Sequence, residues 1–279
     1  MVFAHQGGAK EAPSSTLFAI EMAVASGATG IELDVHQSAD GVLVVCHDPT
    51  VDRTTNGSGA IAQLTIAELE ALDNAYWFVP GLTSAHGRGP GSYPYRGLAD
   101  ADERFRIARL DDVLEATRGY LVNLDIKQSA PAVAPYEARL AQSLREHGRT
   151  SDVIVASFSD RSLAAFKSFA PEVATAAASQ ELTGFVQAVL AGVDPDPSLR
   201  AHVALQMPHR VAGIRLVDER FVLAAHRAGL AIHAWTVDDP SAITSLFEIG
   251  VDGVMSDLPS VAVRCLRDVV ERRNAVATS

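Results

Sequence analysis

The chain lacks several features that would place it in a familiar class at once. It has only two cysteines, Cys46 and Cys265, far apart in its 279 residues. Two such residues build neither a disulfide framework nor a cysteine-based zinc site, so we expect two buried free thiols. No apolar run is long enough to span a membrane, and the first residues show no basic segment followed by an apolar one. We therefore expect no transmembrane segment and a cytoplasmic location.

Positive charge is also scarce, since 23 Lys and Arg face 34 Asp and Glu, a formal net charge of −11. A general nucleic-acid binder shows a basic face, so this balance argues against nucleic acid as a partner. It does not exclude an anionic small molecule, because a bound divalent cation inverts the local field. A serine-nucleophile elbow, a P-loop and a Gly-x-Gly-x-x-Gly motif in a strand-to-helix context are missing as well.

Short apolar runs alternate with amphipathic stretches along almost the whole chain, which is 48% hydrophobic. The runs carry few polar residues, as is typical of strands buried on both faces. Eight strand–helix pairs predict one α/β domain over residues 1–279, a (β/α)8 TIM barrel; an open doubly wound sheet is the alternative if fewer strands form. The expected strands are residues 2–5, 30–35, 120–125, 153–157, 173–177, 202–206, 231–235 and 253–256. The expected helices are residues 16–25, 110–116, 135–147, 161–169, 182–191, 218–228, 241–249 and 259–273.

The segment between the second strand and the helix at Leu110 is too long for an ordinary barrel connection. It begins as a hairpin, with residues 32–37 and 42–46 joined by a turn at Asp40-Gly41. A short helix at 66–72 follows, and residues 74–105 are rich in Gly, Pro, Tyr and Arg. We predict a small cap-like insertion after strand two, residues 48–108, on the carboxyl face where barrel active sites lie.

Carboxylates gather where predicted strands end. Glu32 and Asp34 are two residues apart, so both point to one face of their strand, which in a barrel is the interior. Two buried carboxylates repel each other unless a divalent cation neutralises them; the alternative is a twisted strand with both at solvent. Asp125 and Lys127 repeat the spacing after the third strand. Asp125 is a candidate third ligand for Mg²⁺ or Ca²⁺ and Lys127 a phosphate contact, or the two form a structural ion pair.

Two histidines lie beside these acids in the pattern. His5 closes the first strand before Gly7-Gly8, and His47 ends the hairpin before Asp48. A lone histidine at a strand end is usually structural, but two beside an acidic cluster can accept and donate protons near neutral pH. Trp235 ends the seventh strand, as an apolar wall for a substrate or as rim packing. A cation site flanked by acid–base groups is equipment for cleaving a phosphoester.

Taken together, the motifs resemble the glycerophosphodiester phosphodiesterase family, from one end of the chain to the other. They are H-Q-G-G, A-P-S-S-T, G-I-E-L-D-V, G-V-L-V-V-C-H-D-P, N-L-D-I-K and G-V-D-G-V-M-S-D-L-P. The resemblance implies a TIM barrel with an insertion after strand two. It implies metal-dependent hydrolysis of glycerophosphodiesters to glycerol 3-phosphate and an alcohol. It also implies that His5 and His47 are the acid–base pair and that Lys127 contacts the phosphate. The implied metal ligands are Glu32, Asp34 and Asp125.

The chain departs from the family at two places. Where the family usually has His-Arg-Gly, this chain has Gln6, which has neither the charge nor the two-pronged donor geometry of arginine. Where the family usually has Pro-Glu-Asn-Thr, this chain has Ser14 and Ser15. We still place Gln6 at the substrate, with Lys127 and Trp235, and Arg53 is a candidate replacement for the missing charge.

The expected cofactor is one divalent metal ion, Mg²⁺ or Ca²⁺ first and Mn²⁺ or Zn²⁺ second. The expected partner is a small glycerophosphodiester; no oligomeric state is predicted. The leaving alcohol is expected under the cap, near Trp77, Phe78, Tyr93 and Tyr95. Three alternatives stay open: a phospholipase D-type enzyme acting on lysophospholipids, a barrel lyase or aldolase with a metal-stabilised enolate, and an impaired barrel that binds glycerol phosphate without turnover.

Overall fold

A closed parallel barrel forms the body of the protein. The computed structural model describes residues 1–127 and 132–277, and within them eight strands run side by side in the order β8-β7-β6-β2-β1-β13-β12-β9. A bridge between Ala176 and Ala204 joins the two ends of this series and closes the ring. The (β/α)8 barrel is confirmed, and the open sheet is excluded. The barrel strands are β1 (Val2–His5), β2 (Gly30–Gln37), β6 (Leu121–Ile126), β7 (Val153–Ala156), β8 (Ala174–Thr175), β9 (Ala204–Pro208), β12 (Ala231–Trp235) and β13 (Gly253–Ser256).

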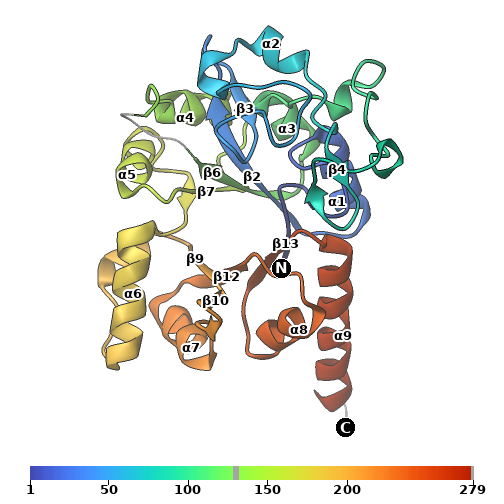
Figure 1. The fold of residues 1–279 in the computed structure, drawn as a ribbon. Helices are drawn as coiled ribbons and strands as arrows, with labels where there is room; N and C mark the ends of the chain where they lie inside the picture. The colour runs from blue at the N-terminus through green and yellow to red at the C-terminus, as the bar shows by residue number, and fades with distance from the viewer. Residues whose placement is uncertain (128–131, 278–279) are drawn as a thin grey trace.

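Helices surround the strands and bury their apolar faces against them (Figure 1). Several start at side-chain caps; Asp218 Oδ1, for example, accepts from the backbone N–H groups of Arg220 and Phe221. No helix of the described segments is long and apolar enough to cross a membrane. The helices are α1 (Leu17–Ala25), α3 (Leu110–Ala116), α4 (Glu137–Glu146), α5 (Asp160–Phe169), α6 (Ser179–Ala191), α7 (Glu219–Ala228), α8 (Pro240–Glu248) and α9 (Pro259–Ala277).

Two strand predictions need correction. The sixth strand occupies Ala204–Pro208 and not 202–206, because a 3₁₀ turn at Pro197–Ala201 runs up to His202. The His202 ring then bonds Thr175 (Nδ1–Oγ1 2.8 Å) and Glu181 (Nε2–Oε2 3.0 Å) instead of extending the strand. The fifth strand keeps only Ala174–Thr175 of the expected 173–177. A small hairpin after β9, formed by β10 (Arg210–Val211) and β11 (Ile214–Arg215), was not predicted.

The segment after β2 begins with the expected hairpin, in which β2 pairs antiparallel with β3 (Leu43–Val45). It continues through α2 (Ile66–Glu70) and a second hairpin of β4 (Phe78–Val79) and β5 (Thr83–Ser84), beside α1 in Figure 1. Aromatic rings of this segment pack on the Arg96 side chain, whose guanidinium lies 3.6 Å from the Tyr93 ring and 4.2 Å from the Tyr76 ring.

The barrel interior is filled by large side chains that two glycines make room for. The Phe3 and His233 rings pack at 4.9 Å between centroids. A Cβ at Gly30 would lie 2.6 Å from the Phe3 ring, and one at Gly253 would lie 2.7 Å from the His233 ring. Because Gly30 and Gly253 carry no side chain, the Phe3 and His233 rings have room to pack in the barrel interior. Both cysteines are buried and free, as predicted.

Candidate active site

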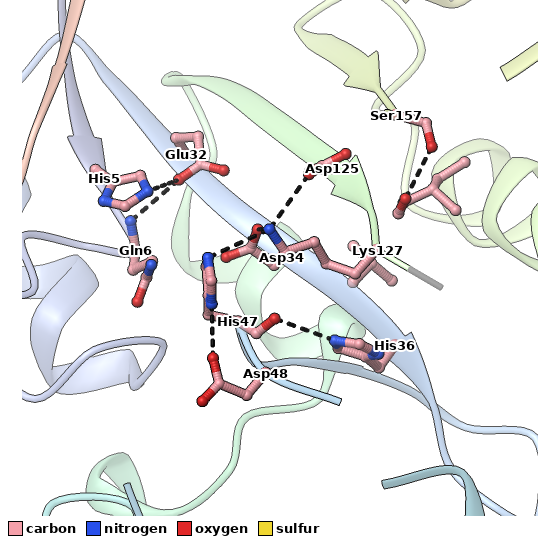
Figure 2. Close-up of polar contacts among 12 residues, drawn as sticks. His5, Gln6, Glu32, Asp34, His36, His47, Asp48, Asp125, Lys127 and Ser157 are labelled. Atoms are coloured by element: carbon pink, nitrogen blue, oxygen red, sulfur yellow. Dashed lines mark hydrogen bonds and ion pairs between the residues drawn. The ribbon is translucent and has the colours of Figure 1, made fainter. Parts of the chain in front are cut away.

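A cavity opens at the carboxyl end of the barrel strands, and most of the predicted site residues line it. His5, Glu32, Asp34, His47, Asp125, Lys127 and Trp235 all contribute to its wall. Figure 2 shows the charged members of this set gathered around the ends of β1, β2 and β6. The register explains the gathering, because Glu32 pairs with His5 on β1 while Asp34 lies beside Asp125 on β6. Neighbouring parallel strands therefore bring these side chains together on two successive levels, His5 with Glu32 and Asp34 with Asp125.

The three carboxylates are buried close to one another. Glu32 is 5%, Asp34 1% and Asp125 6% exposed. Burial, reinforced by the nearby charge of Asp34, raises the pKa of Glu32 well above its usual range. Burial and Asp34 also raise the pKa of Asp125 to about 6. A site that disfavours its own negative charge this strongly calls for a cation.

Lys127 supplies part of that positive charge. Its Nζ lies 3.1 Å from Asp34 Oδ1 and 3.6 Å from Asp125 Oδ2. The same ammonium is 3.3 Å from His47 Nε2. The ion pair that the sequence left as an alternative for Asp125 and Lys127 is therefore present, and it extends to Asp34.

The donor set suits a divalent metal ion in its chemistry. Asp34 Oδ2 and Asp125 Oδ1 are buried with no hydrogen-bond partner, so each has an oxygen free for a ligand. Carboxylate oxygens are the donors that Mg²⁺ and Ca²⁺ prefer. Over residues 1–127 and 132–277, however, no three His, Cys, Asp or Glu side chains already converge as a finished metal site. Lys127 stands among the acids instead, so the residues fit a cation only after this ammonium moves.

His5 is set between acids. Its Nδ1 donates to Asp257 Oδ1 at 2.6 Å, and its Nε2 lies 3.7 Å from Glu32 Oε2. Burial lowers the pKa of His5, but the charges of Glu32, Asp257 and Asp34 outweigh it and raise the pKa to about 9. The opposite ring nitrogens thus have fixed partners, which holds the imidazole in one orientation.

His47 has a similar arrangement with more exposure. Its Nδ1 donates to Asp48 Oδ1 at 2.7 Å, and Arg53 donates to the same carboxylate from Nε at 2.6 Å. The His47 hydrogen bond is the main cause that lowers the pKa of Asp48 far below its usual range. Arg53 is therefore paired with Asp48 in this structure. His36, on the other face of β2, reaches the His47 carbonyl at 3.4 Å from its Nε2.

Gln6 lies beside the cavity and does not line it. It has φ 51°, a left-handed conformation that is strained for a residue with a side chain. Gly7 and Gly8 continue the turn with φ 80° and 96°, and a Cβ on either would meet Ala19 or Pro259 at 2.9 Å. The turn directs the Gln6 backbone N–H to Glu32 Oε2 at 3.2 Å. What the structure shows at Gln6 is a backbone contact to a carboxylate.

The opposite wall of the cavity is neutral and largely apolar. Phe158, after β7, is 61% exposed, and its ring meets Trp235 edge to face at 5.8 Å. Leu182 and Gln206 complete this side. Trp235 lines the cavity and packs against Phe158. None of the residues expected around the leaving alcohol, Trp77, Phe78, Tyr93 and Tyr95, lines this cavity.

Sequence reasoning left several residues near the site without a role: Asp48, Asp257 and Phe158. A signal was present for the two aspartates, since Asp48 follows His47 directly and Asp257 follows the last strand, in S-D-L-P. Only the closed barrel shows that Asp257 meets His5 across 252 positions of sequence.

The fold and the site define the class: a (β/α)8 barrel with paired histidines and buried carboxylates at the carboxyl end of its strands, where barrel enzymes carry out their chemistry. The family follows from comparison with known proteins. The model of the glycerophosphoryl diester phosphodiesterase family matches residues 5–261, and the chain belongs to this family.

Individual relatives agree over nearly the full length. A glycerophosphodiester phosphodiesterase of Caldanaerobacter subterraneus is 31% identical over 272 residues, covering 96% of this chain and 98% of the relative. The crystal structure of a glycerophosphodiester phosphodiesterase from Agrobacterium tumefaciens is 28% identical, with a TM-score of 0.70 over 94% of this chain and 98% of that one. A phosphodiesterase domain from Mycobacterium tuberculosis, 22% identical, superposes with a TM-score of 0.75 over 95% of this chain and 98% of that one and supports the fold alone.

Proposed function

We propose that this chain hydrolyses glycerophosphodiesters to glycerol 3-phosphate and an alcohol, with a divalent metal ion and two histidines. Family membership and the relatives named above support the reaction. The observation that carries the mechanism is the placement of His5 and His47, whose ring centroids lie 6.4 Å apart beside the carboxylates at the cavity.

The histidines divide the proton transfers. One removes a proton from the nucleophile, which is either water or a neighbouring hydroxyl of the substrate, and the other protonates the leaving alkoxide. Both rings present Nε2 away from the aspartate that holds Nδ1. Each histidine is thereby fixed in orientation before substrate arrives, which favours catalysis because little reorganisation is needed.

Glu32, Asp34 and Asp125 would hold the metal ion, through oxygens that include the two unpartnered ones. A bound divalent cation, Mg²⁺ or Ca²⁺ first, supplies charge neutralisation at the phosphoryl oxygens. Lys127 compensates the aspartates here; once a cation compensates them, its ammonium is available to a phosphate oxygen.

The test is release of glycerol 3-phosphate from glycerophosphocholine and glycerophosphoethanolamine, first with EDTA and then with Mg²⁺, Ca²⁺ or Mn²⁺ restored. We expect release only with metal. Release that is unaffected by EDTA would contradict the metal requirement. No release with any metal from folded protein would indicate a changed substrate or a lost activity, and lipid substrates are then tested next.

One observation favours a second substrate class. The exposed Phe158, with Leu182 and Trp235, gives the cavity an apolar side that an acyl chain would contact. The alternative is therefore a phospholipase D-type reaction on lysophospholipids. Choline release from lysophosphatidylcholine micelles, compared with choline release from glycerophosphocholine, distinguishes the two, because the lipid reaction leaves lysophosphatidic acid and no glycerol 3-phosphate.

A further inference from the structure

Asp257 holds His5, and the structure in turn holds Asp257 from two other loops. Asp257 is 9% exposed and accepts from His5 Nδ1. Its backbone N–H donates to Asp238 Oδ1 at 2.8 Å, and its carbonyl accepts from the backbone N–H of Lys10 at 3.1 Å. The loops after β1, β12 and β13 therefore meet at Asp257.

Lys10 closes this arrangement with its charge. Its Nζ lies 2.6 Å from Asp238 Oδ2 and 3.8 Å from Asp257 Oδ2. Without the ammonium, two neighbouring carboxylates would face each other with no cation between them, and Asp257 would be free to turn from His5. Lys10 is not part of the cavity wall, so it has no direct contact with a substrate there.

The second histidine shows the same three-part pattern. His47 is held by Asp48, and Asp48 is held by Arg53. In both cases an imidazole Nδ1 meets an aspartate that is itself paired with a cation. Arg53 pairs with Asp48 directly, whereas Lys10 contacts Asp257 mainly through Asp238. The chain of contacts that ends at His5 therefore has one more residue, and its cation can be changed without changing the aspartate that holds the histidine.

We propose that Lys10 is a positioning residue for His5, acting through Asp238 and Asp257 by locking the loops after β1, β12 and β13 together. The kinetic part of this proposal rests on the proposed function. The ammonium fixes the Asp257 carboxylate, the carboxylate fixes the imidazole, and the imidazole then presents Nε2 to the cavity.

The kinetic experiment compares wild type with Lys10→Met, Lys10→Arg, Asp257→Asn and the double variant Lys10→Met/Asp257→Asn. We expect kcat to fall about tenfold in Lys10→Met and about 100-fold in Asp257→Asn, as for other residues that orient a working side chain. KM should stay within about twofold, because no substrate contact is removed. Lys10→Arg should restore most of kcat, since a guanidinium reaches both carboxylates.

The double variant tests whether Lys10 acts through Asp257. If it does, adding Lys10→Met to Asp257→Asn should cost almost nothing further, because the effects of coupled residues do not add. Full additivity would overturn the proposal. The matched control is Arg272→Met, which removes a surface cation paired with Glu248 at 3.0 Å.

A second readout does not depend on turnover. In protein labelled with ¹⁵N-histidine, the Nδ1–H of His5 should give a downfield proton resonance that Lys10→Met weakens or shifts, Lys10→Arg restores and Arg272→Met leaves alone. A lower melting temperature in Lys10→Met with unchanged kcat and an unchanged His5 resonance would make Lys10 a merely structural residue and overturn the proposal. If wild type turns nothing over, the proposed function fails and the resonance alone decides the role of Lys10.

Discussion

His5 and His233 both lie within the barrel, yet their pKa values shift in opposite directions. Burial lowers the pKa of each, and for His233 it prevails, taking the pKa to about 4. Around His5 the carboxylates reverse the effect and the pKa rises to about 9. His233 has an aromatic and an amide neighbour, with Phe3 at 4.9 Å and Gln206 at 3.5 Å.

The difference reflects two sides of the barrel mouth. We call the ends of β1, β2 and β6 together with the loop after β3 the charged side; it carries His5, Glu32, Asp34, His47, Asp125 and Lys127. We call the ends of β7, β9 and β12 the neutral side; it carries Phe158, Gln206 and Trp235. Under the proposed function, proton transfer would take place on the first side and substrate shape would be selected on the second. Substitutions on each side test this difference between the charged and the neutral side.

The largest effect should come from the histidines of the charged side. His5→Ala or His47→Ala removes a proton-transfer group, which we expect to cost about 10²- to 10⁴-fold in kcat with the fold retained. Glycerol 3-phosphate release and circular dichroism measure the two parts. His226→Ala is the matched control, because this histidine is on α7 and pairs with Asp252. A near-normal rate in either site variant would remove that histidine from the mechanism.

The next effect should separate activity from stability. Asp125→Asn removes the charge of a proposed metal ligand, so activity should fall about 100-fold or more, as when a preorganised charge is lost. Without metal the same variant should unfold at higher denaturant, because one of several crowded carboxylates is gone while Lys127 keeps Asp34 at 3.1 Å. Added Mn²⁺ should raise the melting temperature of wild type more than that of the variant. If the variant is less stable than wild type without metal, repulsion among the three carboxylates does not destabilise the wild-type protein.

Changes on the neutral side should be milder. Phe158→Ala removes an apolar wall contact, worth about tenfold in kcat/KM and expressed mainly in KM. Both substrates release choline, so with glycerophosphocholine and lysophosphatidylcholine measured in parallel the loss should be greater for lysophosphatidylcholine, whose acyl chain would lie against this wall. An unchanged KM for both substrates would place the acyl chain elsewhere. Leu98→Ala, an exposed residue of the insertion, is the control.

The smallest expected effect concerns stability against pH. His233 stays neutral in the folded protein down to about pH 4, whereas the unfolded chain takes up a proton below about 6.5. Between these values the unfolded state binds more protons, so stability falls as the pH falls, by up to roughly 3 kcal/mol from this group. Urea unfolding at pH 7 and pH 4.5 should show a smaller loss in His233→Gln than in wild type. An equal loss in both proteins would assign the acid sensitivity to other groups.

Much of the fold was predictable because its signals are local. The alternation of short apolar runs and amphipathic stretches depends on residues near one another. It predicted all eight barrel strands, with the ends of β2, β6, β7, β8 and β9 displaced by one or two residues. Period-two spacing predicted that Glu32 and Asp34 share a face, and both line the cavity. The β10–β11 hairpin was missed because two-residue strands carry no periodicity.

The sequence by itself determined the barrel, the shared strand face of Glu32 and Asp34 and the presence of two histidines beside the acids. Only the tertiary structure decided which partners these groups have. Asp257 meets His5 because the last strand closes against the first, and Lys127 stands between Asp34 and Asp125 because β2 and β6 are neighbours in register. Arg53 pairs with Asp48, and the neutral side of the mouth is formed by the loop after β7 and by the strands β9 and β12, which are far apart in sequence. The physical reason is that periodicity fixes which face a side chain occupies, while ion pairs and cavity walls depend on distances that exist only once the ring of strands has closed.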